Sequence, residues 1–178
     1  LALSARVSAT LPGSSVPQSA QTLAVLVVGG LFGSRDGTLT VLAYLLAGGA
    51  GAPIFADGAS GWTHLAGPTA GYLLGFVLAA AGIGLLADHR LLQRPASALG
   101  AMVGGHVLIL GLGWTRLAWI LGPEDALRQG VTPFVAGGCI KSLIAATVVV
   151  AVYRLQPANG ASAGRGRVAR SRDHGRHP

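Results

Sequence analysis

Apolar runs recur along almost the whole of this 178-residue chain instead of gathering in one segment. Hydrophobic residues make up 51% of the sequence and charged residues 11%, whereas a soluble domain normally carries roughly 25% charged residues. A helix needs about 20 mainly apolar residues to cross the bilayer, so about five or six spans fill the chain. We therefore expect an all-α integral membrane protein with little room for a soluble catalytic domain.

Turn and charge signals divide these runs into six expected transmembrane helices. The second is short and has to borrow from the polar residues before it, which brings Gln21 near membrane depth. Because the sequence opens at Leu1 without a methionine or a basic signal region, we expect the start of the first helix to lie upstream. The expected spans are residues 1–11, 22–32, 38–49, 69–86, 96–121 and 131–153.

Two of the connections between these spans are expected at the same end of the bundle. Residues 48–61 are rich in glycine and include Pro53 and Asp57, so we expect an irregular cap at the membrane surface. Residues 122–130 are expected to form a loop beside it. Several irregular elements that meet at one end predict a ligand pocket under the cap.

The basic residues predict the orientation, because cytoplasmic loops are enriched in Lys and Arg. If the N-terminus is inside, Arg35, Arg90 and Arg94 are all cytoplasmic, as is the arginine-rich C-terminal end. Six spans then place both termini in the cytoplasm and the cap on the extracellular face. We expect a multi-pass protein of a bacterial plasma membrane.

The C-terminal residues 154–178 contain six of the thirteen basic residues. A Gly/Ala/Ser/Arg segment without aromatic residues is typical of a disordered cytoplasmic tail that is drawn to anionic lipid. The net charge of +7 therefore favours the bilayer as a partner and not nucleic acid. We expect two parts, a membrane domain over residues 1–153 and this tail.

A polar, glycine-rich turn leads directly into an apolar segment over residues 67–76. Gly67 and Thr69 are candidate caps for a helix that begins there. From Gly71 to Ala79 small residues recur every four positions, which lets another helix or a ligand approach the backbone closely. Spacing alone leaves both interpretations open, helix packing and ligand binding.

Lys141 is the single lysine of the chain and falls inside the last expected span. An ammonium near the middle of a membrane costs about 2.5 kcal/mol or more, so it usually faces a cavity or a partner. Its helix carries no nearby acid, which favours a bound anion, although a snorkelling or structurally paired lysine is the alternative. Phe134 could supply an apolar wall nearby. His106, inside the fifth span, is interpreted as a packing residue in preference to a proton relay.

Enzyme chemistry has little support in the sequence. No paired carboxylates share a helix face, and no Cys/His cluster has metal-ligand spacing. The single cysteine, Cys139, is interpreted as a packing residue. No P-loop motif occurs, so ATP-driven transport would require another subunit. We expect neither a metal nor a cofactor.

Five segments in the same order resemble the BioY family, the substrate-binding components of energy-coupling-factor biotin transporters. The most specific is Gly-Pro-Thr-x-Gly-Tyr-Leu-x-Gly-Phe at residues 67–76. The resemblance covers about residues 5–153 and leaves the arginine tail outside. The segments are residues 21–26, 31–37, 51–55, 67–76 and 130–141.

This resemblance implies a six-helix membrane protein that is not an enzyme and binds biotin in an outward-facing pocket. It also implies a transmembrane coupling subunit and two ATPase subunits as partners. The small-residue docking face of the first helix would fall on Ala5 and Ala9. Carried over to this chain, the substrate-binding residues are Thr69, Gly71, Tyr72 and Lys141, with Gln21 and Phe134 as further lining residues.

The chain departs from the family pattern at Gly138, where members usually have an aspartate three residues before the lysine. That spacing places both groups on one helix face, where the carboxylate could accept ureido N–H bonds and neutralise the ammonium. Another group could replace it, or the ligand could be a biotin precursor or another small carboxylate. A membrane enzyme or a structural scaffold is the more distant alternative.

Overall fold

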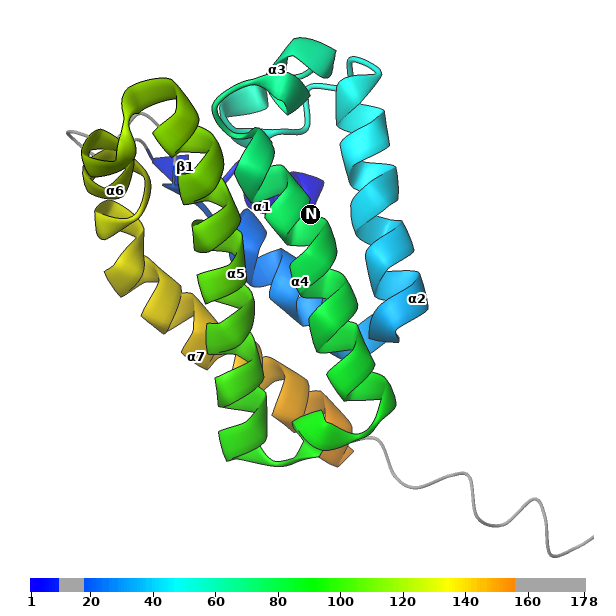
Figure 1. The fold of residues 1–178 in the computed structure, drawn as a ribbon. Coiled ribbons are helices and arrows are strands. Elements are labelled where there is room, and N and C mark those ends of the chain that lie inside the picture. The colour runs from blue at the N-terminus through cyan, green and yellow to red at the C-terminus, as the bar shows by residue number, and fades with distance from the viewer. Residues whose placement is uncertain (10–17, 156–178) are drawn as a thin grey trace, which may run out of the picture.

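A computed structural model describes residues 1–9 and 18–155 of the chain, which form helices and one short pair of strands (Figure 1). Four of the helices are long and span most of the molecule. In chain order, the elements are α1 (Ala2–Ala5), β1 (Ser8–Ala9), β2 (Gln18–Ser19), α2 (Gln21–Gly49), η1 (Ala56–Gly58), α3 (Trp62–Ala66), α4 (Ala70–Asp88), η2 (Leu91–Gln93), α5 (Pro95–Leu121), α6 (Pro123–Gly130) and α7 (Thr132–Leu155).

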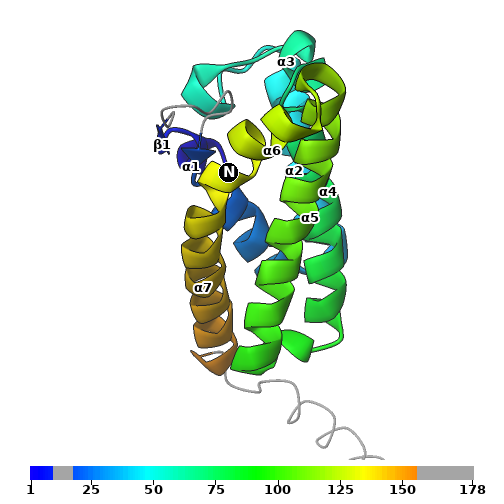
Figure 2. The ribbon, with the colours of Figure 1, turned by 60° about the vertical axis from the view of Figure 1, so that its left-hand side comes forward.

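The long helices form an elongated bundle, and the short elements gather at its ends (Figures 1 and 2). α3 covers one end, which we call the cap end; α6 and β1 also lie toward it. The α4–α5 connection and the end of α7 lie at the opposite end. Within the described residues, α2, α4, α5 and α7 are long and apolar enough to cross a membrane. The expected all-α, multi-pass membrane class is confirmed at this level.

The two expected spans over residues 22–32 and 38–49 form the two halves of α2, which bends at Gly33. Gly33 has φ 77° and ψ −176°, a backbone conformation that is essentially restricted to glycine. The residues before Gly33 lead away from the cap end and those after it return (Figure 1). Asp88 holds the second half, since its carboxylate accepts from the Ser34 amide at 3.1 Å and the Ser34 hydroxyl at 2.5 Å.

A helix was expected over residues 1–11, but among the described residues 1–9 it ends at Ala5, so its expected length is wrong. The chain is then extended, and Ser8 pairs with Ser19 in the antiparallel β1–β2 ladder. Polar contacts to the cap hold this segment: the Ser8 hydroxyl donates to the Asp57 carboxylate at 2.6 Å. Residues 10–11 lie outside the described residues.

The connection that was expected as a loop over residues 122–130 is a helix, α6. Pro123 occupies its first turn, where the missing N–H costs nothing. Glu124 and Asp125 lie in the first turn and Arg128 in the last, so these charges complement the helix dipole. The segment was expected as a loop because it is short and polar. The favourable N-terminal proline and the charges at both ends stabilise the helix in spite of its low apolar content.

The small residues of α4 form a packing face. α4 begins at Ala70, and Thr69 occupies the N-cap position without a side-chain cap hydrogen bond. A side chain on Gly71 would collide with the Leu112 carbonyl of α5, and one on Gly75 would lie 2.8 Å from the Ile109 Cα atom. Close contact between α4 and α5 therefore accounts for these two glycines.

Candidate functional site

A small cavity of about 60 Å³ near the cap end collects side chains from almost every part of the chain. β2 and the first turn of α2 form one side, η1 and α3 contribute from the cap, and α4, α5 and α7 complete the wall. The lining residues are Ser19, Gln21, Thr22, Phe55, Ala56, His64, Thr69, Tyr72, Leu73, Phe76, Ile109, Leu110, Phe134 and Lys141. Convergence of distant segments on a few polar groups in an apolar wall is typical of a ligand site.

Lys141 provides the positive charge of this cavity. It is half-buried in α7, and its Nζ atom donates to the Ser19 carbonyl of β2 at 2.6 Å. An ammonium has three donors, so N–H groups remain for a ligand. β2 is itself tied to α7, because the Gln18 side-chain amide donates to the Pro133 carbonyl. An anion in the cavity would thus meet a cation that a main-chain carbonyl only partly satisfies.

Gln21 lines the cavity from within a hydrogen-bond network. Its side chain is buried, donates from Nε2 to the Tyr44 hydroxyl at 2.5 Å, and accepts from the Ser19 hydroxyl at 2.7 Å. The Tyr44 hydroxyl continues to the Ile54 carbonyl at 2.8 Å. This chain of contacts connects β2, both halves of α2 and the cap, so Gln21 fixes the shape of the site.

Tyr72 and Phe134 supply the aromatic wall. Tyr72 is buried, and its hydroxyl donates to the Gly130 carbonyl at 2.7 Å. Gly113 gives the ring its space, since a side chain there would collide with it. The Phe134 ring lies 6.2 Å from the Tyr72 ring at a 34° tilt. Tyr72 therefore offers its ring to the cavity while its hydroxyl holds the end of α6.

The cap contributes Phe55 and His64, with Thr69 beside them. The His64 and Phe55 rings are stacked, with centroids 5.1 Å apart and 19° between planes. The Thr69 hydroxyl lies 3.4 Å from His64 Nε2. Burial lowers the pKa of His64 below its ordinary value, because desolvation disfavours the charged imidazolium.

The structure brings five of the six expected substrate-binding residues to one cavity: Gln21, Thr69, Tyr72, Phe134 and Lys141. Gly71 is placed elsewhere, beside α5 at an outer groove. The two expected docking residues also separate, because Ala5 is buried in α1 and Ala9 lies in β1. The ligand role of Gly71 and the docking role of the alanines stay predictions.

Sequence reasoning missed Ser19, Thr22 and Phe55, which all line the cavity. The Thr22 hydroxyl is buried and has no hydrogen-bond partner among the described residues. Its position next to Gln21 at the start of an apolar run was the available signal. His64, just before the motif at residues 67–76, also lines the cavity, and its ring is stacked on that of Phe55.

Gly138 faces a histidine across the α5–α7 contact. A Cβ atom at Gly138 would lie 3.4 Å from the His106 ring. His106 is 6% exposed, and its Nδ1 atom lies 2.9 Å from the Ser142 hydroxyl. Its other nitrogen, Nε2, has no hydrogen-bond partner within the described residues. His106 does not line the small cavity; it lies one helical turn from Ile109 and Leu110, which do.

The sequence matches the model of the BioY family over residues 1–158. This chain belongs to the BioY family. Several curated BioY proteins are similar over most of their length. The biotin transporter BioY of Thermotoga maritima is 35% identical over 148 residues, which cover 83% of this chain and 86% of that protein.

Two further BioY relatives show the same level of similarity. The biotin transporter BioY of Rhizobium etli is 36% identical over 155 residues, covering 80% of this chain and 82% of the relative. The biotin transporter BioY2 of Lactococcus lactis is 35% identical over 168 residues, covering 86% and 88%. The family assignment therefore extends over the bundle and the cap.

The fold is that of a solved relative. The S-component for biotin from an ECF-type ABC transporter superposes with a TM-score of 0.78, covering 87% of this chain and 85% of that chain. Sequence identity across this alignment is 20%, so the match shows that the two chains share a fold.

Proposed function

We propose that this chain binds biotin and acts as the substrate-binding component of a biotin uptake transporter. The observation that carries the proposal is the position of Lys141, a partly satisfied cation inside a membrane span that lines a cavity. Its BioY relatives in three organisms are named biotin transporters. Family and site chemistry support the same ligand.

Biotin combines a carboxylate and a ureido group with an apolar ring and chain, and the cavity offers a partner for each. The Lys141 ammonium suits an oxygen with negative charge, because charge-assisted hydrogen bonds are the strong ones. The rings of Tyr72, Phe134 and Phe55 suit the apolar parts. The buried Thr22 hydroxyl, without a partner in the described chain, suits a polar group of the ligand.

Ligand entry requires the site to widen. The cavity measures about 60 Å³, whereas pockets for small molecules usually measure about 300–1,000 Å³. β2 and the cap contribute short elements that form fewer helical hydrogen bonds than the bundle. We therefore place the widening there, with the ligand replacing the Ser19 carbonyl at Lys141.

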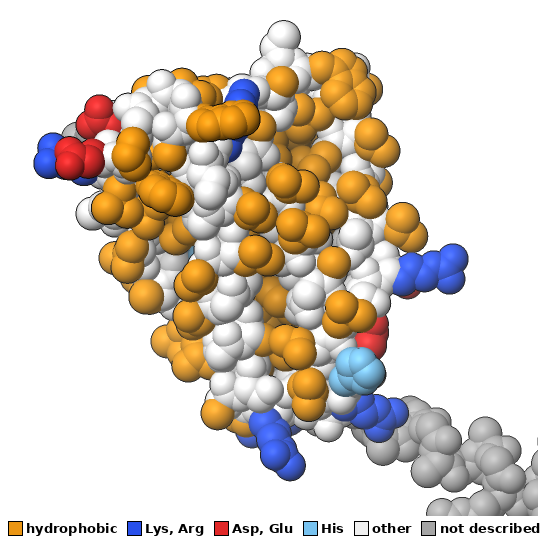
Figure 3. Space-filling view, in the orientation of Figure 1, with side chains coloured by type: hydrophobic (Ala, Val, Ile, Leu, Met, Phe, Trp, Pro, Cys, Tyr) orange, Lys and Arg blue, Asp and Glu red, His pale blue; other side chains and the backbone are white. Residues whose placement is uncertain are grey.

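The proposed topology has six spans with the cap outside. The two halves of α2 count as separate spans, and α4, α5, α7 and the expected first span, which contains α1, complete the six. Arg35 follows the bend of α2, Arg90 and Arg94 flank η2, and Arg154 lies in the last turn of α7. These elements lie toward the end opposite the cap, where arginine side chains are visible (Figure 3). The positive-inside rule then supports cytoplasmic termini.

Uptake is proposed to depend on partners. A transmembrane coupling subunit and two ATPase subunits would supply the energy, since no P-loop motif occurs in the sequence. Ala5 and Ala9 remain the proposed contact with the coupling subunit.

Substitution of Lys141 tests the proposal. We expect Lys141→Met to bind labelled biotin at least about tenfold more weakly than the wild type, because a hydrogen bond to a charged group contributes about 1.5–3 kcal/mol. Lys141→Arg keeps the charge and is the matched control, with a smaller loss. Equilibrium binding to the purified protein measures both, and unchanged affinity in Lys141→Met would contradict the assignment.

A second ligand, another small carboxylate or a biotin precursor, is favoured by the absence of an acid in α7. Without a neighbouring carboxylate, the Lys141 ammonium gains most from a ligand that supplies the anion itself. Competition against labelled biotin separates the two. Displacement by dethiobiotin at lower concentration than by biotin would identify the precursor as the ligand.

A further inference from the structure

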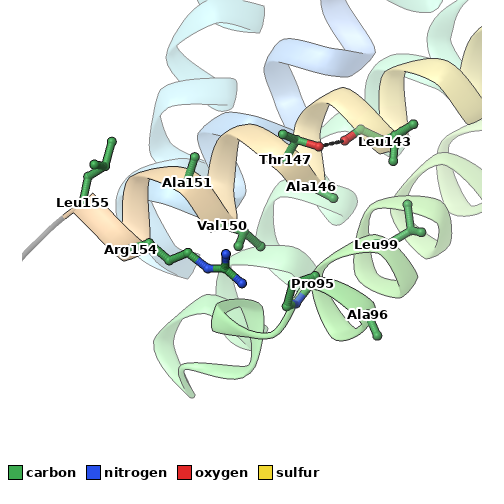
Figure 4. Close-up of a pocket in the computed structure, with 10 residues that line it drawn as sticks. All are labelled: Pro95, Ala96, Leu99, Leu143, Ala146, Thr147, Val150, Ala151, Arg154 and Leu155. Carbon is green, nitrogen blue, oxygen red and sulfur yellow. Dashed lines mark hydrogen bonds between the residues drawn. The ribbon is translucent and has the colours of Figure 1, made fainter.

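An apolar groove lies between the first half of α5 and the second half of α7, and none of its lining residues lines the ligand cavity (Figure 4). Its volume is about 610 Å³. Leu99 and Leu143 border it and are exposed on the outside of the bundle, so the groove faces the hydrocarbon of the membrane. Small side chains, such as Ala96 and Ala151, leave the space between the two helices open.

The groove has the length of one membrane leaflet. Its lining along α7 runs from Leu143 to Leu155 and includes Arg154, three turns beyond Leu143. At 1.5 Å per residue, Leu143 and Arg154 are about 16 Å apart along the helix. Half of the hydrocarbon thickness of a bilayer is about 15 Å. An acyl chain that lies in this groove would therefore reach from the membrane surface to about its middle.

One charged side chain stands at the end of the groove. The Arg154 guanidinium extends toward Pro95 at the start of α5 (Figure 4). Within residues 1–9 and 18–155, Arg154 has no hydrogen-bond or ion-pair partner. The hydroxyl of Thr147, a polar group deeper in the groove, already donates to the Leu143 carbonyl at 2.8 Å. The groove thus presents an apolar wall with a cation at one end.

The surrounding charge favours an anion at Arg154. Arg94 directly precedes Pro95 of the groove, and Arg35 and Arg90 flank the bend of α2 and η2 at the same end. The acids there are Asp36 and Asp88, and the Asp88 carboxylate already accepts two hydrogen bonds from Ser34. The C-terminal residues 156–178 carry five arginines and one aspartate, so their charge does not complement this site. The complementary occupant is an amphiphile that joins an acidic head to a long apolar chain.

We propose that this groove binds an anionic phospholipid, with the phosphate at Arg154 and an acyl chain between α5 and α7. The Arg154 fork holds phosphate oxygens by paired hydrogen bonds. The chain fills the volume that small side chains such as Ala96 and Ala151 leave open between the helices. This site is independent of the ligand cavity and of the identity of the transported molecule.

Native mass spectrometry of the purified full chain tests the proposal. The protein is mixed with equal amounts of a phosphatidylglycerol and a phosphatidylcholine that carry the same acyl chains. We expect the wild type to retain phosphatidylglycerol about tenfold more than phosphatidylcholine. Arg154→Gln should lose this preference, while Arg35→Gln, which removes an exposed arginine outside the groove, should keep it.

A second pair of variants tests the acyl chain. Ala151→Trp fills the groove and leaves Arg154 in place, so it should retain less of either lipid; Ala136→Trp adds the same ring to an exposed position of α7 outside the groove and should behave as the wild type. Equal retention of the two lipids by the wild type would overturn the proposal. The proposal would also be overturned if Arg154→Gln kept the same preference for phosphatidylglycerol as Arg35→Gln. It would be overturned too if Ala151→Trp retained as much of both lipids as Ala136→Trp.

Discussion

Two threonine hydroxyls of α2, those of Thr22 and Thr38, are buried without a hydrogen-bond partner in the described part of the chain. Thr22 lines the ligand cavity, whereas Thr38 lies beyond the bend at Gly33 and does not. An unsatisfied buried hydroxyl costs stability unless a ligand or water completes it. Only the Thr22 hydroxyl is placed where a ligand could bind to it, so the same substitution at Thr22 and at Thr38 distinguishes a binding role from a structural one.

We expect Thr22→Val to weaken biotin binding about two- to twelvefold, because a lost hydrogen bond costs about 0.5–1.5 kcal/mol. Thr38→Val makes the same chemical change away from the cavity and should leave affinity unchanged. Isothermal titration of both variants provides the measurement. Equal affinities for the two variants would show that the Thr22 hydroxyl does not contact the ligand.

At the scale of the elements, the bend in α2 is the feature on which the bundle depends. It reverses the chain between two helical segments, and Asp88 at the end of α4 accepts hydrogen bonds from Ser34 directly after it. A Cβ atom at Gly33 would meet the Asp88 carboxylate, which would then have to shift away from Ser34. Helix α4 therefore packs against both halves of α2.

Gly33→Ala should destabilise the protein by about 1–3 kcal/mol from backbone strain, with the collision at Asp88 in addition. Gly82→Ala is the matched control, since Gly82 lies inside α4 with open space at its Cβ position. Alanine there should be neutral or stabilise by up to about 1 kcal/mol. Thermal unfolding in detergent compares the stabilities of the two variants. If Gly33→Ala were as stable as Gly82→Ala, the bend would not require glycine at position 33.

At the scale of the whole molecule, the proposed ligand site joins parts of the chain that are distant in sequence. Lys141 of α7 contacts Ser19 of β2, and Tyr72 of α4 contacts Gly130 of α6. A ligand that binds among these elements interacts with all of them only in the folded state. Its binding free energy therefore adds to the free energy of unfolding of the bundle.

Biotin at about 100 times its dissociation constant should stabilise the folded protein by about 2.7 kcal/mol. For a chain of this size that corresponds to a rise in Tm of roughly 5–10 °C. Thermal unfolding with and without biotin measures the shift, and Lys141→Met at the same biotin concentration should show a smaller one. A Tm that biotin leaves unchanged at saturation would contradict a site that joins these elements.

The sequence by itself determined the membrane class and most of the long helices. Low charge and long apolar runs are local properties, and they located α4, α5 and α7 within a few residues. The rarity of lysine also singled out Lys141. Motif resemblance selected Tyr72 and Thr69, which the structure places at the same cavity as Lys141. These features depend on composition and spacing along one segment.

Only the tertiary structure decided which residues share the cavity and how the chain reaches it. Thr22 and His64 line the cavity because β2, the cap and α7 meet there, and no pattern within one segment records that meeting. Gly71 belongs to the same motif as Tyr72, yet neighbouring positions on a helix point about 100° apart, so it faces α5 instead. The bend at Gly33 likewise depends on Asp88, which is distant in sequence. Packing between helices, which sequence spacing does not specify, determines the site.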